Sequence, residues 1–185
     1  MCGRSVCGGH ARLAVICEKC KARRERVEFL VREAEPRDRK VIGELVKRFW
    51  GEDVQTAFGR EFRVRELPAF VAVAEGRVVG FVSFAELDES SVAIVAVGVL
   101  PEHQGLGIGK ALLRAVEERA KVSSKKQLLV STTNDDLPAL AFYQLAGFRI
   151  YEVIPDAIAE KHGGEIPGIG GIPIRDEIRL YKPVL

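Results

Sequence analysis

The stretch Val99–Leu113 reads VLPEHQGLGIGKALL and joins two different patterns. It begins at the end of an apolar run, residues 91–100, which is typical of a strand buried on both faces of a sheet. It ends in residues 107–122, where apolar side chains recur on one side of a helix. Between the two, glycines alternate at positions 105, 107 and 109. The stretch therefore predicts a strand, a glycine-rich turn and a helix in direct succession.

The glycine-rich turn favours a bound anion. A ligand can approach a backbone that lacks side chains, and the free N–H groups and positive dipole end of a helix start attract negative charge. The spacing excludes a Walker loop, because Ala111 stands where a Mg²⁺-binding hydroxyl is required. It also excludes the dinucleotide fingerprint G-x-G-x-x-G, because the glycines here read G-x-G-x-G. The turn therefore predicts a phosphate-bearing ligand of another kind.

Strand-like and helix-like segments alternate along the rest of the chain. Apolar alternation and apolar runs predict strands, and spacing of three to four residues predicts helices. Strands are expected at 27–34, 69–87 (a hairpin), 91–100, 126–133, 148–154 and 176–184, and helices at 36–51, 107–122 and 137–148. Residues 52–64 are interpreted as a short helix and a loop. The fold class is therefore α/β (α+β), with a mixed, mostly antiparallel central sheet flanked by helices.

Composition limits the class of protein. The chain has 185 residues, 47% of them hydrophobic, and no apolar run approaches the length of a membrane span. Its formal net charge of +2 is too small to indicate nucleic acid by itself. The N-terminus lacks the apolar segment of a signal peptide, so a cytoplasmic location is expected.

All four cysteines stand in the first twenty residues, spaced C-x4-C-x9-C-x2-C. Two close pairs of thiolates can hold one tetrahedral zinc ion, so Cys2, Cys7, Cys17 and Cys20 are predicted to bind structural Zn²⁺. His10 could replace Cys2, and a disulfide, free thiols or an iron–sulfur centre remain alternatives. The domain boundary is placed so that residues 1–26 form this arm and residues 27–185 form the main domain.

Two motifs resemble the GNAT superfamily of N-acetyltransferases. AVGV followed by PEHQGLGIGKALL is similar to the family's acetyl-coenzyme A signature, and Asn134 with LPALAFYQLAGF is similar to its N-x4-A-x3-Y-x3-G-F segment. The resemblance covers residues 27–153 and leaves out the cysteine arm. It implies the mixed GNAT fold and an enzyme that transfers acetyl from acetyl-coenzyme A to a primary amine of a small molecule or peptide.

The resemblance also implies a role for particular residues. The backbone of Val97–Val99 would contact the pantetheine arm and the thioester, and Gly98 could mark a β-bulge. Asn134 would hold the cofactor or the adjacent strand. Tyr143 would contact the cofactor and act as general acid for the leaving thiolate. The expected cofactor-binding residues are Val97, Gly98, Val99, Gln104, Gly105, Leu106, Gly107, Ile108, Gly109, Lys110, Asn134 and Tyr143.

The general base and the acceptor are less well defined by the sequence. The strand at 91–100 carries no carboxylate, so Glu86, at the end of the preceding strand, is the preferred base. Glu61, Glu66 and His103 are alternatives, and an acceptor amine of low pKa would need no base. The long segment 155–177, rich in glycine and proline, is interpreted as a lid over the acceptor, with His162, Glu165 or Asp176 facing it.

Two other classes of function remain open. The chain could be a coenzyme A-binding regulatory module whose zinc arm contacts a protein or nucleic acid, although the basic run 19–26 lacks the aromatic residues that stack on bases. Alternatively, zinc in the arm could join subunits into a homo-oligomer. No membrane association is expected.

Overall fold

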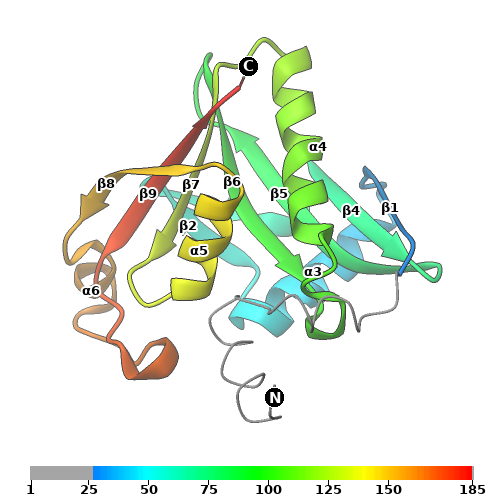
Figure 1. Ribbon diagram of the computed structural model, residues 1–185. Coiled ribbons are helices and arrows are strands. Elements are labelled where there is room, and N and C mark those ends of the chain that lie inside the picture. The colour runs from blue at the N-terminus through cyan, green and yellow to red at the C-terminus, as the bar shows by residue number, and fades with distance from the viewer. Residues whose placement is uncertain (1–26, 185) are drawn as a thin grey trace, which may run out of the picture. The chain divides into compact units, whose positions relative to one another are not determined.

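The computed structural model describes residues 27–184, which form a mixed sheet with helices (Figure 1). The seven-stranded sheet has the order β1-β4-β5-β6-β7-β9-β8, and β2 and β3 form a separate pair. Most neighbouring strands are antiparallel, and β6 and β7 are parallel. The predicted fold class is confirmed.

The bounds of the elements are as follows. The strands are β1 (Phe29–Glu33), β2 (Val54–Ala57), β3 (Arg60–Arg63), β4 (Ala69–Ala74), β5 (Arg77–Glu86), β6 (Ser91–Val99), β7 (Gln127–Thr133), β8 (Arg149–Ile154) and β9 (Glu177–Pro183). The α-helices are α3 (Asp38–Trp50), α4 (Ile108–Val122), α5 (Leu137–Leu145) and α6 (Ala157–His162). Short 3₁₀ helices are η1 (Val64–Glu66), η2 (Pro101–His103) and η3 (Ile169–Gly171).

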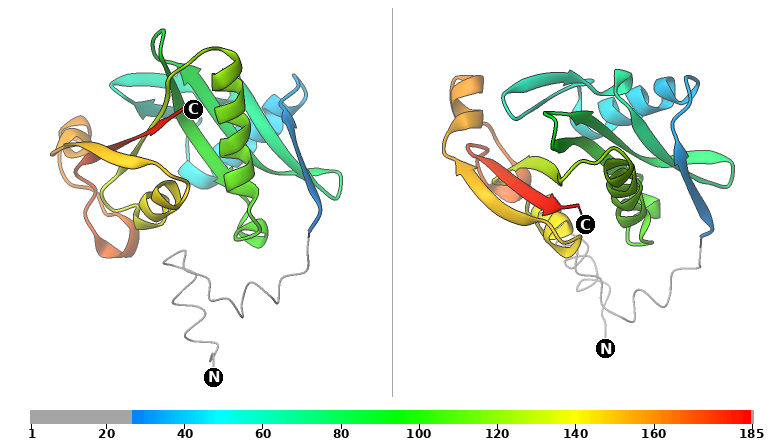
Figure 2. Two further views of the ribbon diagram at one scale, coloured as in Figure 1. Left: turned by 45° about the horizontal axis from the view of Figure 1, so that its top comes forward. Right: turned by 90° about the horizontal axis from the view of Figure 1, so that it is seen from above.

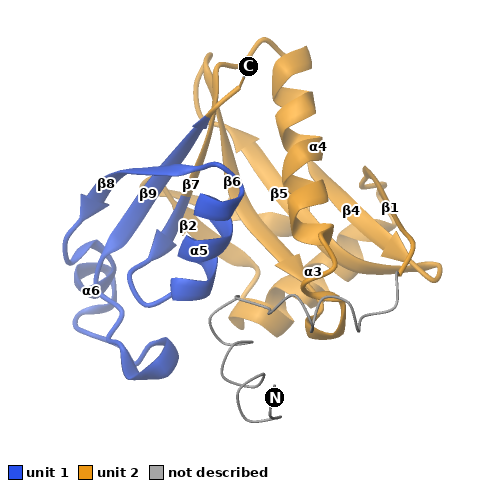
Figure 3. Ribbon diagram, viewed as in Figure 1, with its two compact units in different colours: residues 1–25, 131–182 blue, residues 26–130, 183–185 orange. Residues whose placement is uncertain are grey.

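The described residues fall into two compact units, coloured separately in Figure 3. One unit holds residues 131–182, and the other holds residues 27–130 with 183 and 184. The boundary predicted at residue 26 lies at the edge of the described residues and stays a prediction.

In the unit of residues 27–130, helices cover both faces of the strands (Figure 2). Helix α3 buries Ile42 and Val46 in a cluster that includes Phe81 of β5. Helix α4 buries Leu112 and Val116, and each such fully buried aliphatic side chain contributes about 2 kcal/mol. Side chains at adjacent positions of β6 point to opposite faces of the sheet, and α3 and α4 both contact this strand. Strand β6 is therefore covered on both sides, as predicted.

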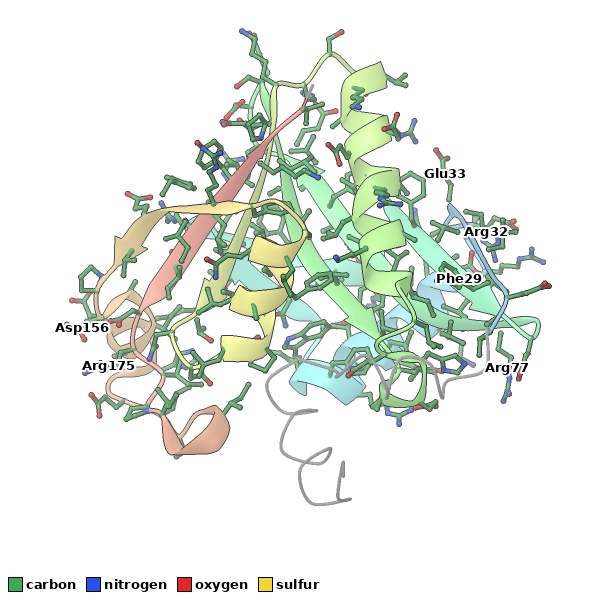
Figure 4. All side chains as sticks on the ribbon, viewed as in Figure 1. Phe29, Arg32, Glu33, Arg77, Asp156 and Arg175 are labelled. Carbon is green, nitrogen blue, oxygen red and sulfur yellow. The ribbon has the colours of Figure 1, made fainter. Side chains whose placement is uncertain are left out.

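The start of α3 is joined to β1 by a partly buried ion pair. Arg32, labelled in Figure 4, donates to Asp38 over 2.6 Å, and the N–H of Glu35 donates to the same carboxylate over 2.7 Å. The hydrogen bond from Arg32 lowers the pKa of Asp38. The helix therefore begins at a defined point above the sheet.

The prediction for residues 52–64 was wrong, because these residues form the hairpin β2–β3. Ala57 pairs with Arg60, so the loop has two residues, Phe58 and Gly59, with φ of 54° and 69°. Positive φ at both positions gives the turn the twist that a tight hairpin requires. Phenylalanine is unusual in such a turn, so the sequence pattern did not indicate a hairpin here.

In the unit of residues 131–182, β8 pairs with β9, α5 contacts β8, and Tyr143 of α5 packs against the buried ring of Phe148. Pro138 stands in the first turn of α5, and Gly147 follows the end of the helix with φ of 94°, residues typical of a helix start and a helix end. The segment 155–177, interpreted as a lid, contains α6 and η3. No helix in the described part of the chain is long and apolar enough to cross a membrane.

Candidate functional site

Strand β6 is irregular near its C-terminal end. Its pairing with β5 shifts between Ser83 and Phe84, so that Ala96 and Ile94 have partners on β5 and Val95 has none. The bulge therefore lies at Val95, and its prediction at Gly98 was wrong, because Gly98 pairs in regular register with Phe81. The parallel ladder between β6 and β7 runs only from Ser91 to Ile94 on β6. Beyond the bulge, the described ladder of β6 is on the β5 side alone.

Gly98 allows α3 to pack closely against β6. A Cβ added there would lie 2.6 Å from the Phe49 ring of α3, far inside normal contact. Phe49 in turn makes an edge contact with Trp50, whose ring contacts Phe81. The glycine therefore lets an aromatic side chain lie directly on the backbone of β6.

The glycine-rich turn has the geometry that an anion site requires. Gly105 and Gly107 have φ of 76° and 87°, which other residues rarely adopt. A Cβ at Gly107 would meet nothing within 4 Å, so the space above this backbone is open. The amide side chain of Gln104 donates to the carbonyl of Val99 over 3.0 Å and joins the turn to the end of β6.

Helix α4 begins directly at this turn. Gly107 is its N-cap residue, no side chain in the described part of the chain caps it, and its first turn has no acidic residue. Its first N–H groups are therefore not used by a side-chain cap, and no carboxylate in that turn repels an anion. Ile108 is 1% exposed and anchors the helix start in the core. The turn is thus a rigid cradle with its amides available.

His103 stands just before the turn and is half-buried. Its Nδ1 is enclosed and has no hydrogen-bond partner among the described residues. The structure therefore places this candidate base next to the cradle predicted to bind phosphate.

Tyr143 lies on α5 in an aromatic environment. Its ring contacts Phe142 and Phe148, with centroids 5.3 and 5.6 Å away, and its side chain is only 6% exposed. Burial raises the pKa of its hydroxyl, and the negative charge of Asp136 raises that pKa further. The phenol therefore keeps its proton throughout the neutral range.

Asp136 is a residue that the sequence analysis missed. It is the N-cap of α5, and its carboxylate accepts the N–H of Ala139 over 3.0 Å. Burial raises the pKa of Asp136, the bond from Ala139 opposes that rise, and the charge of Asp135 adds to it. An aspartate followed by Pro138 in a first helical turn was the available signal, since both are favoured at helix starts.

Asn134 ties the end of β7 to the segment before β9. Its side-chain amide donates to the carbonyl of Pro173 over 2.9 Å, and its oxygen accepts the N–H groups of Arg175 and Asp176 over 2.8 and 3.0 Å. These contacts resemble the second of its two expected roles, that of holding an adjacent strand. Its assignment to cofactor binding stays a prediction.

Asp135 fastens the same segment further along. It is 2% exposed and accepts the N–H of Ile169 over 2.8 Å. Its other oxygen accepts the hydroxyl of Thr133. The segment interpreted as a lid is therefore bonded to the start of α5 by two adjacent side chains.

Three residues of this segment, Asp176, Glu165 and His162, are expected to face the acceptor. Asp176 accepts the N–H of Asp156, and Glu165 lies 3.8 Å from Arg175 (both Asp156 and Arg175 are labelled in Figure 4). His162 is exposed. The proposed orientation of these side chains stays a prediction.

Glu86, the preferred base, lies at the far end of β5 from Gly98. It pairs with Val92, whereas Gly98 pairs with Phe81, five residues earlier on β5. That separation is roughly 16 Å along a strand. The carboxylate is exposed and bound to Lys125 at 2.8 Å. The structure therefore does not bring Glu86 together with the end of β6.

The other two carboxylates considered as bases, Glu61 and Glu66, are also exposed. Glu61 is exposed on β3, and Glu66 lies 3.6 Å from Arg63 at the surface. Glu66 lines a cavity of about 210 Å³ between the end of β1 and the start of β4, at the other end of α3 from Phe49.

The four cysteines predicted to bind zinc, Cys2, Cys7, Cys17 and Cys20, lie outside the described residues, as does His10. Within residues 27–184, no group of three or more His, Cys, Asp or Glu side chains could hold a metal ion. The zinc site stays a prediction.

Comparison with known proteins connects these features to a family. The family model described as acetyltransferase (GNAT) family matches residues 27–148. The Bacillus subtilis protein YdhI is 34% identical over 149 residues, which cover 78% of this chain and 91% of that protein. The Bacillus subtilis protein YxbD is 31% identical over 152 residues, covering 80% and 92%.

Solved structures agree with this match. An IAA acetyltransferase from Bacillus cereus is 28% identical, with a TM-score of 0.61 over 84% of this chain and 99% of that one. A GNAT family acetyltransferase from Elizabethkingia anophelis, with acetyl-CoA bound, is 21% identical, with a TM-score of 0.62 over 84% and 97%. The second likeness concerns the fold alone.

Proposed function

This chain belongs to the acetyltransferase (GNAT) family and is an acyltransferase, and we propose that it transfers acetyl from acetyl-coenzyme A to a primary amine of a small molecule or peptide. The observation that carries the proposal is the open glycine cradle at the start of α4. A pyrophosphate needs several N–H donors, a positive dipole end and no obstructing side chain. The turn around Gly107 supplies all three.

In this proposal the residues of the cradle, Gln104 to Lys110, bind the pyrophosphate. The side chain of Gln104 keeps its hydrogen bond to Val99 and so links the cradle to the end of β6. The backbone of Val97–Val99 offers its amide groups to the pantetheine arm. This part of β6 lies beyond the end of its parallel ladder with β7, which supports that role.

A backbone N–H at the end of β6 stabilises the oxyanion that forms when the amine attacks the thioester carbon. Removing one such donor from an oxyanion site costs about 3 kcal/mol in other enzymes. The bulge at Val95 supports this assignment, since a bulge turns backbone groups out of the regular ladder.

Tyr143 protonates the departing coenzyme A thiolate. The ordinary pKa of a thiol is about 8.5, so the thiolate takes up a proton when it leaves. The Tyr143 phenol is protonated and buried. A general acid must carry its proton and have it available, and these features support that role.

The proposal assigns no side chain as base. Glu86 is bound to Lys125 and lies at the end of the β5–β6 pair that is opposite to Gly98. Strand β6 itself carries only apolar residues, apart from Ser91 at its first position. In this proposal the acceptor attacks as a free amine or loses its proton to water.

Release of the coenzyme A thiol in the presence of a panel of primary amines tests the function. We expect release with at least one amine, and Tyr143→Phe should lower its kcat by about a hundredfold while changing the coenzyme A Kd less than threefold. A Tyr143→Phe enzyme with full kcat would remove the residue from the mechanism. Binding of acetyl-coenzyme A without release for any amine would favour the coenzyme A-binding module.

A further inference from the structure

Strand β8 lies at one edge of the seven-stranded sheet, outside β9 (Figure 1). Within the described residues it pairs with β9 on one side and with no strand on the other, so one row of its backbone N–H and C=O groups has no ladder partner. Three of its six residues are large, apolar and exposed, namely Ile150 at 45%, Tyr151 at 46% and Val153 at 51%. An edge strand with these properties is a template for pairing with another chain.

Strand β8 contains a bulge. Ile150 pairs with Leu180, and Glu152 pairs with Arg179, the preceding residue of β9, so Tyr151 is an extra residue without a partner on β9. One extra residue shifts the alternation of side chains along the strand by one position. Residues three apart across the bulge therefore lie on the same face of the sheet, whereas in a regular strand they lie on opposite faces.

The shift brings opposite charges to one face of β8. Tyr181 and Arg179 are two apart on β9 and share a face. Their respective partners on β8, Arg149 and Glu152, therefore share that face too. The Glu152 side chain is 45% exposed, and one of its oxygens lies 2.9 Å from Arg179. Arg149 is exposed and makes no ion pair with a described residue.

The opposite face of β8 is apolar. Ile150 pairs with Leu180, and Val153 pairs with Ile178. Leu180 is fully buried, whereas Ile150 and Val153 on the same face are about half exposed. The strand therefore presents an apolar face and a charged face, and both reach solvent at the edge of the sheet.

We propose that β8 is the interface of a homodimer, in which β8 of a second copy of this chain pairs with it antiparallel across a two-fold axis. In the register that we infer, Ile150 lies opposite Val153 of the second copy, and Val153 lies opposite Ile150 of the second copy. The proposal does not depend on the catalytic roles proposed above.

This register matches both faces of the strand. On the apolar face, Ile150 and Val153 of the two copies cover each other. On the charged face, Tyr151 lies opposite Glu152 of the second copy, and Arg149 lies diagonal to that glutamate. Diagonal neighbours in an antiparallel pair are about 7–8 Å apart, a distance that long side chains span. By symmetry the contact forms twice, and each Arg149 gains the anionic partner that it lacks within its own chain.

The bulge favours a second copy over a strand of another protein. In the inferred register, the extra residues of the two copies lie next to each other at the two-fold axis. The two strands therefore have the same number of residues between Ile150 and Val153. A regular strand has one residue fewer over the same length, so its side chains would fall on the wrong faces beyond the bulge.

The other edge of the sheet is occupied to a greater extent by contacts within the chain. In β1, Arg32 lies 2.6 Å from Asp38 of α3, and Glu33 lies 2.7 Å from Arg119 of α4. Leu30 is the exposed large apolar residue of β1, at 63%, whereas β8 has three. Strand β8 therefore has both the larger apolar area and an unpaired cation.

Sedimentation equilibrium of the full chain over a range of protein concentrations tests the proposal. A chelator and a reductant in every sample remove the contribution of a metal or a disulfide in residues 1–26. We expect a monomer–dimer equilibrium for the wild type. Arg149→Glu should raise the dimer Kd about tenfold or more, because it places a second carboxylate beside Glu152 of the other copy. Adding Glu152→Arg to this variant should return the Kd to within about threefold of the wild type.

Val153→Lys gives a second measurement that does not depend on the ion pairs. A lysine on an edge strand opposes strand pairing, and the exposed position accommodates it in the monomer. We expect this variant to be monomeric, with the melting temperature of the wild type at a dilution where both are monomers. Leu30→Lys at the other edge is the matched control and should leave the dimer Kd unchanged. In the wild type, the amides of residues 149–154 should exchange more slowly above the dimer Kd than below it.

A wild type that stays monomeric at about 1 mM would overturn the proposal, as would a dimer that survives both Arg149→Glu and Val153→Lys. A dimer that forms only without chelator and reductant would assign association to residues 1–26, and one that Leu30→Lys dissociates would assign it to β1. Either result also overturns the proposal. If Glu152→Arg prevents folding, as seen by circular dichroism, Arg149→Glu and Val153→Lys decide without it.

Discussion

Two glycine-rich segments of this protein use the same residue for opposite reasons. At the start of α4, Gly107 has positive φ and open space where a Cβ would be. In the segment before β9, a Cβ at Gly168 would collide with the carbonyl of Ile172 and lie 2.6 Å from the Asp135 carboxylate. The first glycine leaves room for a ligand, and the second lets the chain pack against itself.

The difference shows that glycine content alone does not indicate a ligand site. The decisive quantity is what occupies the space next to the backbone. Around Gly168 that space is filled by a buried carboxylate that also accepts the N–H of Ile169. Around Gly107 no atom of the described residues occupies it, and none of their side chains caps the adjacent helix start. Substitutions in the two segments should therefore change different measured quantities.

The largest effect is expected for Gly168→Ala. The added methyl group has to displace backbone and a buried carboxylate, and such overpacking costs about 3 kcal/mol. Urea unfolding should show this loss, with the coenzyme A Kd unchanged in the folded protein. Gly170→Ala is the matched control, because its φ is 67° with open space, and only about 1 kcal/mol of backbone strain is expected. Equal stability of both variants would contradict the packing argument.

Gly107→Val should mainly impair binding. A branched side chain in the open space of the cradle excludes the pyrophosphate, and we expect the coenzyme A Kd to rise about a hundredfold, measured by calorimetry. Gly107→Ala separates the obstruction from the strain, because both variants require an L-residue at φ of 87°. Its smaller methyl group should raise the Kd less than Val does. If Gly107→Val binds coenzyme A normally, the cradle does not hold the phosphates.

The smallest effect is expected for Asn134→Ala. The substitution leaves three backbone groups of the segment before β9 without their side-chain partner, but water reaches part of this region. The free energy of unfolding should fall by about 1–2 kcal/mol. A coenzyme A Kd within twofold of the wild type would assign Asn134 to the structure alone, and a large rise would restore its cofactor role.

Much of the fold could be predicted because its elements carry strong local signals. The apolar run of β6 and the amphipathic pattern of α4 each identify an element without tertiary information. The hairpin β2–β3 escaped detection because its turn residue Phe58 adopts a positive φ that side chains usually avoid. Helix α6 was not predicted, because its six residues, which lie between prolines and glycines, are too few to show a helical repeat of apolar side chains.

The features of the candidate site were predicted with less success than the elements of the fold. The glycine-rich turn lies where the sequence predicted it, directly before α4, and its binding of phosphate stays a prediction. The bulge was placed at Gly98 and lies at Val95, because pairing register depends on both strands and not on the residue that bulges. Asp136 was overlooked, because its role as N-cap depends on the exact residue at which α5 begins.

The sequence by itself determined the family, the class of fold and the position of the glycine-rich turn, because periodicity and glycine spacing act over a few neighbouring residues. Only the tertiary structure decided which glycines face open space, which carboxylate acts on Tyr143, and that Glu86 is bound to Lys125. The reason is physical: burial, electrostatic effects and steric contact depend on what lies next to a group in space, and residues distant in sequence supply most of it.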